Sequence, residues 1–91
     1  MILEVQYRQA FLKDLKQLKS STSYQRIYEV AFTTLAAINS LEEISDIKSM
    51  KGYSHRYRIR IGDYRIGIEV NDDFIEVMRV LYRREFYRYF P

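Results

Sequence analysis

The stretch that decides the fold of this chain is Tyr57-Arg58-Ile59-Arg60-Ile61-Gly62-Asp63-Tyr64-Arg65. From position 56 to position 61, arginines alternate with apolar residues, which is the two-residue period of a half-buried strand. Gly62-Asp63 predicts a two-residue hairpin turn of the Gly-X kind, and the alternation resumes over Tyr64–Val70. We therefore expect a hairpin that places Arg58, Arg60 and Arg65 together on one exposed face of a sheet.

Guanidinium groups held this close repel one another and are stabilised by an anion between them. Gly67 falls on the same face and is expected to leave space beside the arginines. The charge is uneven along the chain, because residues 1–50 carry six Lys/Arg and six Asp/Glu, whereas residues 51–91 carry nine and six. Eight of these nine cations are arginine, which favours planar, bidentate contacts with phosphate. A polyanion is therefore the expected partner.

Length and composition exclude several classes of protein. A chain of 91 residues with 47% hydrophobic residues predicts one globular domain spanning residues 1–91. It has no cysteine and one histidine, so disulfides, thiolate catalysis and a protein-only transition-metal site are not expected, and we predict no cofactor. The start of the chain lacks the pattern of a signal peptide, and no apolar run approaches the roughly 20 residues that span a bilayer. We expect a cytoplasmic protein.

Hydrophobic periodicity places the remaining elements around the hairpin. It predicts an α+β fold of the order β-α-α-β-β-β, in which a helical hairpin packs on one face of a twisted antiparallel sheet. The C-terminal residues combine arginines with aromatic side chains, and we expect a short helix or an extended arm in which Phe86 and Phe90 cap the sheet. The predicted elements are a strand over Ile2–Arg8, helices over Gln9–Lys19 and Tyr24–Ile38, a polar connection over Asn39–Met50, a strand over Phe74–Tyr82 and the tail from Arg83.

This arrangement resembles the RelE/ParE superfamily of toxins from type II toxin–antitoxin pairs. The resemblance covers essentially the whole chain, and it rests on Tyr57–Ile66 in the hairpin and Val80–Tyr87 near the end. The branch of the family that cleaves mRNA on the ribosome uses two basic residues on the first hairpin strand, an arginine on the next, an arginine after the last strand and a C-terminal tyrosine. The branch that poisons DNA gyrase generally lacks this set, so the resemblance implies the RelE-like mRNA interferase branch.

Carried onto this sequence, the resemblance implies a set of site residues and partners. The partners it implies are a cognate antitoxin protein and mRNA in the ribosomal A site, with contacts to ribosomal RNA. The 2′-OH beside the scissile phosphate is the nucleophile in such a reaction, so the protein supplies positioning, charge and proton transfer. The implied catalytic residues are Arg60, Arg65, Arg83 and Tyr87, and the implied RNA-binding residues are Lys51, Arg58 and Arg84; no metal site is implied.

The proton acceptor stays open. Many relatives carry lysine at one or both of the positions of Arg58 and Arg60, and arginine, which stays protonated in proteins, is a poor general base. A group from the ribosome is one alternative to these arginines. Tyr89 is the alternative to Tyr87 as the functional tyrosine. The other candidates for the base are Lys51, His55 and Tyr57.

Three functions compete at this point. One is the mRNA endonuclease, and the second is a gyrase inhibitor on the same fold. The third is a non-enzymatic RNA-binding or inactive toxin-like domain, because alternating arginines on a strand are commonly a solvated outer face. Cleavage of translated RNA, trapping of gyrase on DNA, and absence of toxicity distinguish the three.

Overall fold

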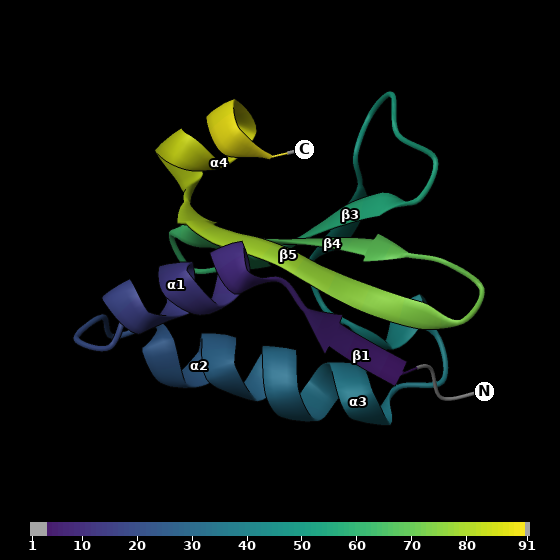
Figure 1. Cartoon of the computed structure of the whole chain (residues 1–91), viewed down its shortest axis with the longest axis horizontal. Helices are drawn as coiled ribbons and strands as arrows, with labels where there is room; N and C mark the ends of the chain where they lie inside the picture. The colour runs from purple at the N-terminus through teal and green to yellow at the C-terminus, as the bar shows by residue number, and fades with distance from the viewer. Residues whose placement is uncertain (1–3, 91) are drawn as a thin grey trace.

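A five-stranded sheet forms the centre of the molecule in the computed structural model, which describes residues 4–90 (Figure 1). The strand order is β1-β5-β4-β3-β2, so the last strand of the chain lies beside the first. The predicted hairpin is present, and Gly62 in its turn has a φ of 58°, which glycine adopts without strain. The strands are β1 (Glu4–Tyr7), β2 (Ile47–Ser49), β3 (Arg56–Ile61), β4 (Tyr64–Val70) and β5 (Phe74–Tyr82).

The α+β class is confirmed, and the expected antiparallel pairing holds for every strand pair except one. β1 runs parallel to β5, with Val5 opposite Ile75, so the sheet is mixed. The chain reaches this parallel position because the helices carry it back across one face before the meander begins. Ile2, at the start of the predicted first strand, lies outside the described residues.

The predicted helical hairpin packs on the lower face of the sheet in Figure 1. Its first helix is α1 (Gln9–Gln17). The second is continuous and consists of α2 (Tyr24–Glu29), a π-helical segment (Val30–Thr34) and α3 (Leu35–Ala37). In the π segment the Leu35 N–H donates to the carbonyl of Val30, so Ala31 loses its usual helical donor, and the hydroxyl of Tyr7 donates to the Ala31 carbonyl at 2.7 Å instead.

Strand β5 contains a bulge that the alternation of its residues did not predict. Ile68 pairs with Val77 and Gly67 pairs with Arg79, so Met78 is the extra residue. The sequence predicts Val77 and Val80 on opposite faces, but both lie in the core beneath the sheet. β1 pairs with β5 only as far as Val77. Beyond that point the carboxylate of Asp14 accepts a hydrogen bond from the Val80 N–H at 3.1 Å and binds the Arg79 guanidinium through two bonds of 2.7 and 2.9 Å.

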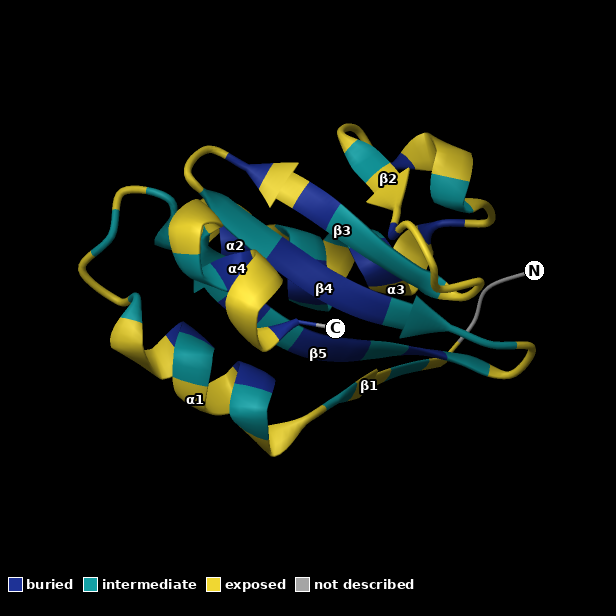
Figure 2. Cartoon of the chain, turned by 90° about the horizontal axis from the view of Figure 1, so that it is seen from above, coloured by how far each residue is buried: buried dark blue, intermediate teal, exposed yellow. Residues whose placement is uncertain are grey.

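Two apolar layers hold the elements together. The larger one lies between the helical hairpin and the sheet, and includes Phe11, Ile27 and Ile66. The smaller one lies on the opposite face, where the C-terminal helix α4 (Arg83–Tyr89) crosses β4 and β5 (Figure 2). Phe86 and Phe90 are fully buried in it beside Met50 and Met78, so they cap the sheet as predicted.

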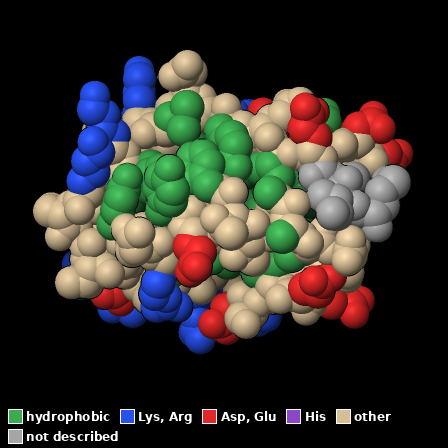
Figure 3. Space-filling view, turned by 90° about the horizontal axis from the view of Figure 1, so that it is seen from below, with side chains coloured by type: hydrophobic (Ala, Val, Ile, Leu, Met, Phe, Trp, Pro, Cys, Tyr) green, Lys and Arg blue, Asp and Glu red, His purple; other side chains and the backbone are tan. Residues whose placement is uncertain are grey.

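The outer surface of the helical hairpin carries a band of apolar side chains (Figure 3). Leu12 and Tyr28, both expected in the buried stripes of their helices, have exposed fractions of 39% and 45%. The ring of Tyr28 contacts that of Phe32 in a tilted arrangement, and Phe32 stacks with Tyr7, which continues the aromatic contacts toward β1. Within residues 4–90, none of the helices has the length and apolar character needed to cross a membrane.

Candidate functional site

The hairpin β3–β4 brings three arginines to the upper face of the sheet. Arg58 lies opposite Gly67, and Arg60 lies opposite Arg65, so the three side chains share one face. The intervening Ile59 and Ile66 are buried in the layer below, which fixes the register through their packing. The arginines therefore face away from the helical hairpin, and they lie on the face that α4 partly covers.

Helix α4 adds an arginine and a tyrosine to this group. The Arg83 N–H donates to the carbonyl of Asp63 in the hairpin turn at 2.8 Å, which ties the start of α4 to the end of the hairpin. Arg83 Nε lies 3.9 Å from Asp63 Oδ1, and both side chains are exposed. Tyr87 follows Arg83 by four residues, so the two lie on the same side of the helix. Its exposed fraction is 57%.

Arg65 lies at the centre of the group. Burial lowers the pKa of Arg65 from its usual value, and the positive charge of Arg58 lowers it further. Arg60 and Arg83 also lower this pKa, whereas Tyr87 raises it. The four side chains are therefore near enough to influence the pKa of one guanidinium. We call Arg58, Arg60, Arg65, Arg83 and Tyr87 the arginine cluster.

The Arg65 guanidinium is directed toward the hairpin turn. Its Nη1 donates to the carbonyls of Gly62 and Tyr64, each at 3.0 Å. These bonds fix one edge of the guanidinium, and within residues 4–90 no carboxylate forms an ion pair with it. A positive charge that is half-buried, surrounded by other cations and without a carboxylate is stabilised by an added anion such as a phosphodiester.

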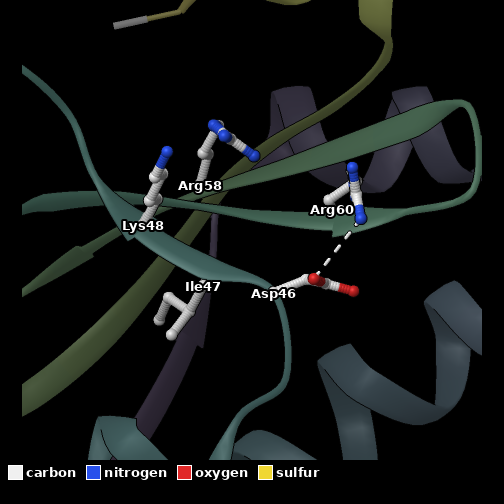
Figure 4. A pocket seen from close by; sticks show the side chains of 5 residues that line it. All are labelled: Asp46, Ile47, Lys48, Arg58 and Arg60. Atoms are coloured by element: carbon white, nitrogen blue, oxygen red, sulfur yellow. Dashed lines mark hydrogen bonds and ion pairs between the residues drawn. The ribbon is translucent and has the colours of Figure 1, made fainter.

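A shallow pocket of about 230 Å³ continues the charged face onto β2. Lys48 of β2 lies opposite Arg58 of β3, and both side chains extend to the same side of the sheet (Figure 4). Arg60 turns toward Asp46, and their charged atoms are 3.5 Å apart. The pocket is lined by Asp46, Ile47, Lys48, Arg58 and Arg60.

Comparison with known proteins identifies the family. A family model described as the ParE toxin of the parDE type II toxin–antitoxin system matches residues 5–87. Over 90 residues the chain is 42% identical to Toxin RelE3 of Methanocaldococcus jannaschii, an alignment that covers 98% of this chain and 100% of that protein. The chain belongs to the RelE/ParE superfamily of type II toxins. The resemblance drawn from the hairpin and the C-terminal residues is thereby confirmed.

Solved structures show the same relationship. The toxin aligns with a chain of the RelB-RelE antitoxin-toxin complex from Methanococcus jannaschii with a TM-score of 0.77 and 44% identity, covering 94% of this chain and 99% of that chain. It aligns with a chain of the archaeal RelE-RelB complex from Pyrococcus horikoshii OT3 with a TM-score of 0.63 and 25% identity, covering 91% and 97%. The relatives named RelE place the toxin nearest the RelE members of the superfamily.

Two residues expected to bind RNA lie outside the arginine cluster. Lys51 is exposed in the turn after β2, near the Arg56 end of β3. Arg56 and Arg60 are four residues apart on that strand, so Lys51 is separated from Arg60 by roughly 13 Å or more along the sheet. Arg84 is exposed on α4, and its side chain leaves the helix about 100° around the axis from that of Arg83.

The candidate bases from the toxin's own chain are also distant from Arg65. Tyr57 lies opposite Ile68 and packs against the core beneath the sheet, so its ring is on the wrong face. His55 is exposed at the far end of β3, where its carbonyl accepts from the Val70 N–H at 2.9 Å. The structure brings neither of them, nor Lys51, to the arginine cluster.

Gly67 has a different role from the one expected. Instead of leaving open space beside the arginines, it lies under the ring of Phe90, whose nearest atom would be 2.7 Å from a Cβ at this position. The guanidinium of Arg56 lies over the same ring at 5.7 Å and over the ring of Tyr53 at 5.4 Å. Arg56 also binds Glu69 at 2.9 Å, so it is occupied by structural contacts rather than facing the cluster.

Two residues of the charged face were missed by sequence reasoning. Lys48 and Asp46 fall in the stretch 39–50, which we expected to be a polar connection, but which contains a 3₁₀ turn (Leu41–Glu43) and β2. The sequence pattern that would predict β2 as a strand is weak, because β2 has three residues and only Ile47 is apolar. Asp46 has a φ of 58°, an uncommon conformation for a residue other than glycine, and its carbonyl accepts from the Arg60 N–H at 3.1 Å.

Proposed function

We propose that this toxin is a ribosome-dependent mRNA endoribonuclease that arrests translation in the cytoplasm. The observation that carries the proposal is the convergence of three arginines and a tyrosine around Arg65, on the face of the sheet opposite the helical hairpin. The relatives named RelE support the same branch. A free strand of RNA presents the phosphates that this charge favours and the bases that stack on an exposed tyrosine.

The proposed reaction uses the RNA as its own nucleophile. The 2′-OH loses its proton to a base as its oxygen attacks the adjacent phosphorus. The bond to the 5′-oxygen of the next nucleotide breaks and that oxygen takes up a proton, so the products are a 2′,3′-cyclic phosphate and a 5′-OH. Arg65 and Arg83 stabilise the charge that develops on the phosphate oxygens, and Arg60 supports them. Tyr87 orients a base beside the scissile bond, and Arg58 holds the neighbouring backbone.

Proton transfer is assigned in part to the ribosome. Arginine stays protonated, and the candidate bases Lys51, His55 and Tyr57 lie away from the cluster. A ribosomal group that accepts the 2′-OH proton would explain why the toxin acts only on RNA held in the A site. The ribosome also supplies the in-line geometry that a shallow open site does not impose.

An antitoxin partner is the second part of the proposal. The two relatives above were solved as complexes of RelE with RelB. An antitoxin segment carrying carboxylates would neutralise the arginine cluster and cover the face on which RNA binds. Complementary charge of this kind increases the association rate and makes binding sensitive to salt.

Replacing Arg65 tests the proposed activity. Arg65→Ala removes a transition-state contact, so we expect mRNA cleavage on ribosomes to fall by on the order of 10²–10³-fold and growth arrest to be lost. The measurement is primer extension on mRNA in translating ribosomes, with end analysis of the products. Lys16→Ala, which removes an exposed cation from α1 on the helical side of the sheet, serves as the control and should cleave like the parent toxin.

The same experiment separates the competing functions. Full toxicity of Arg65→Ala with gyrase trapped on DNA would replace this proposal with the gyrase inhibitor. Products that end in a 3′-OH would exclude 2′-oxygen attack. A parent protein that cleaves nothing and does not slow growth would indicate the inactive, non-enzymatic domain.

A further inference from the structure

Strand β2 extends the charged face beyond the arginine cluster. It pairs with β3 so that Lys48 lies opposite Arg58, while its neighbour Ile47 packs against the core below. The alternation along β2 therefore directs Lys48 to the upper face, and Figure 4 shows its amino group on the same side as the Arg58 guanidinium. Sequence reasoning assigned no function to this lysine.

The charges around the pocket favour an anion. Its lining contains three cations, Lys48, Arg58 and Arg60, and Asp46 is the one carboxylate among the described residues that line it. Asp46 is engaged with Arg60 at 3.5 Å, and within residues 4–90 neither Lys48 nor Arg58 forms an ion pair. Two neighbouring cations without a partner carboxylate remain available to a phosphate.

Within the pocket, Lys48 lies on the far side of Arg58 from Arg65, so Lys48 and Arg65 are placed to contact different phosphates of one strand. Lys48 is two strands away from Arg65, and it is level with Gly67 rather than with Arg65. A strand spacing of about 4.8 Å and a rise of about 3.3 Å per residue put their backbones roughly 12 Å apart. The bonds from Arg65 to the carbonyls of the turn direct its guanidinium further from β2.

We propose that Lys48 and Arg58 form a second phosphate site, which binds a backbone phosphate next to the scissile one in the same RNA strand. This inference rests on the proposed function and extends it. The strand crosses the sheet from α4 toward β2, with its reacting phosphate at Arg65 and Arg83 and a flanking phosphate in the pocket. Lys48 is a binding residue that touches no reacting atom, so its loss weakens RNA binding rather than the chemical step.

The salt dependence of RNA binding tests this assignment. A short single-stranded RNA with 2′-O-methyl groups throughout binds without being cleaved, and fluorescence anisotropy in a series of KCl concentrations gives the slope of log K against log salt. Each lost phosphate contact lowers the slope by about 0.7 for single strands. We expect this decrease in Lys48→Ala, its recovery in Lys48→Arg, and no change in Lys16→Ala, which removes an exposed lysine from α1.

A scan with neutral linkages identifies the phosphate. Methylphosphonate is placed at one linkage at a time around the cleavage position mapped with unmodified mRNA. We expect a neutral linkage beside the scissile one to weaken binding to the parent toxin severalfold but to have no further effect on Lys48→Ala. An unchanged salt slope in Lys48→Ala, or additive losses at every linkage, would overturn the second site. Neither outcome affects the cleavage measured with Arg65→Ala, so the two proposals fail separately.

Discussion

Arg83 and Arg84 are adjacent in the sequence but occupy different surroundings. The Arg83 N–H is bonded to the hairpin turn, and its charge acts on Arg65. Successive residues of a helix are about 100° apart around its axis, so Arg84 projects away from the side that Arg83 shares with Tyr87. The orientation of α4 about its axis therefore determines that Arg83, and not Arg84, faces the arginine cluster.

This difference predicts unequal effects of two matched substitutions. Arg83→Ala should lower cleavage on ribosomes by on the order of 10²-fold, because it removes charge next to the scissile phosphate. Arg84→Ala should lower it by no more than a few fold. Primer extension gives the cleavage, and thermal unfolding checks that both variants fold, since both side chains are exposed. A larger loss in Arg84→Ala would mean that α4 presents its other side to the RNA.

At the scale of elements, the position of α4 controls the site. The helix has seven residues and is held by Phe86 and the following Phe90, which pack on Met50 and Met78. Gly67 permits this docking because a Cβ there would meet the Phe90 ring at 2.7 Å. Arg83 and Tyr87 reach Arg65 only while these contacts keep the helix on the sheet.

We therefore expect Gly67→Ala to act on α4 rather than on β4. The added methyl group would push the Phe90 ring away, which should cost about 1–3 kcal/mol of unfolding free energy and lower cleavage by displacing Tyr87. Urea denaturation measures the first effect and primer extension the second. In a Phe90→Leu background the smaller side chain leaves room, so the same substitution should cost less. Equal costs in both backgrounds would show that the two residues do not interact.

At the scale of the whole molecule, charge and apolar surface are on opposite faces. The arginine cluster and the pocket lie above the sheet, and the apolar band of Figure 3 lies on the outer surface of the helical hairpin. An antitoxin that inhibits the toxin by neutralising charge has to reach the upper face. Inhibition and RNA binding then compete for the same arginines.

This competition predicts how an antitoxin behaves. The cognate antitoxin, sought as a short acidic protein encoded beside the toxin, should displace the 2′-O-methyl RNA, and its affinity should fall as KCl rises from 0.1 to 0.5 M. Competition anisotropy measures the displacement, and isothermal titration calorimetry measures the affinity. Arg58→Ala should weaken both complexes, whereas Lys16→Ala should weaken neither. An antitoxin that binds equally at both salt concentrations and leaves the RNA bound would contradict neutralisation of the arginine cluster.

The sequence by itself determined the hairpin, its arginine face, the helical hairpin and the family. These features depend on short-range patterns, namely the two-residue period of a strand, the Gly-X turn and the spacing of apolar residues on a helix. The convergence of Arg58, Arg60 and Arg65 follows from that local alternation once the turn is placed. Phe86 and Phe90 were also predicted to cap the sheet with their rings, and both are buried there.

Only the tertiary structure decided which charged residues join the site. The three-residue β2 is stabilised by its pairing with β3, so Lys48 and Asp46 carry no clear local signal. The bulge at Met78 moves Val80 to the core face, and the packing of Phe90 on Gly67 positions α4. Each of these features depends on pairing or packing between residues that are distant in the sequence. The same long-range contacts leave Lys51 and Arg84 outside the arginine cluster, and they place Lys48 where it extends the charged face.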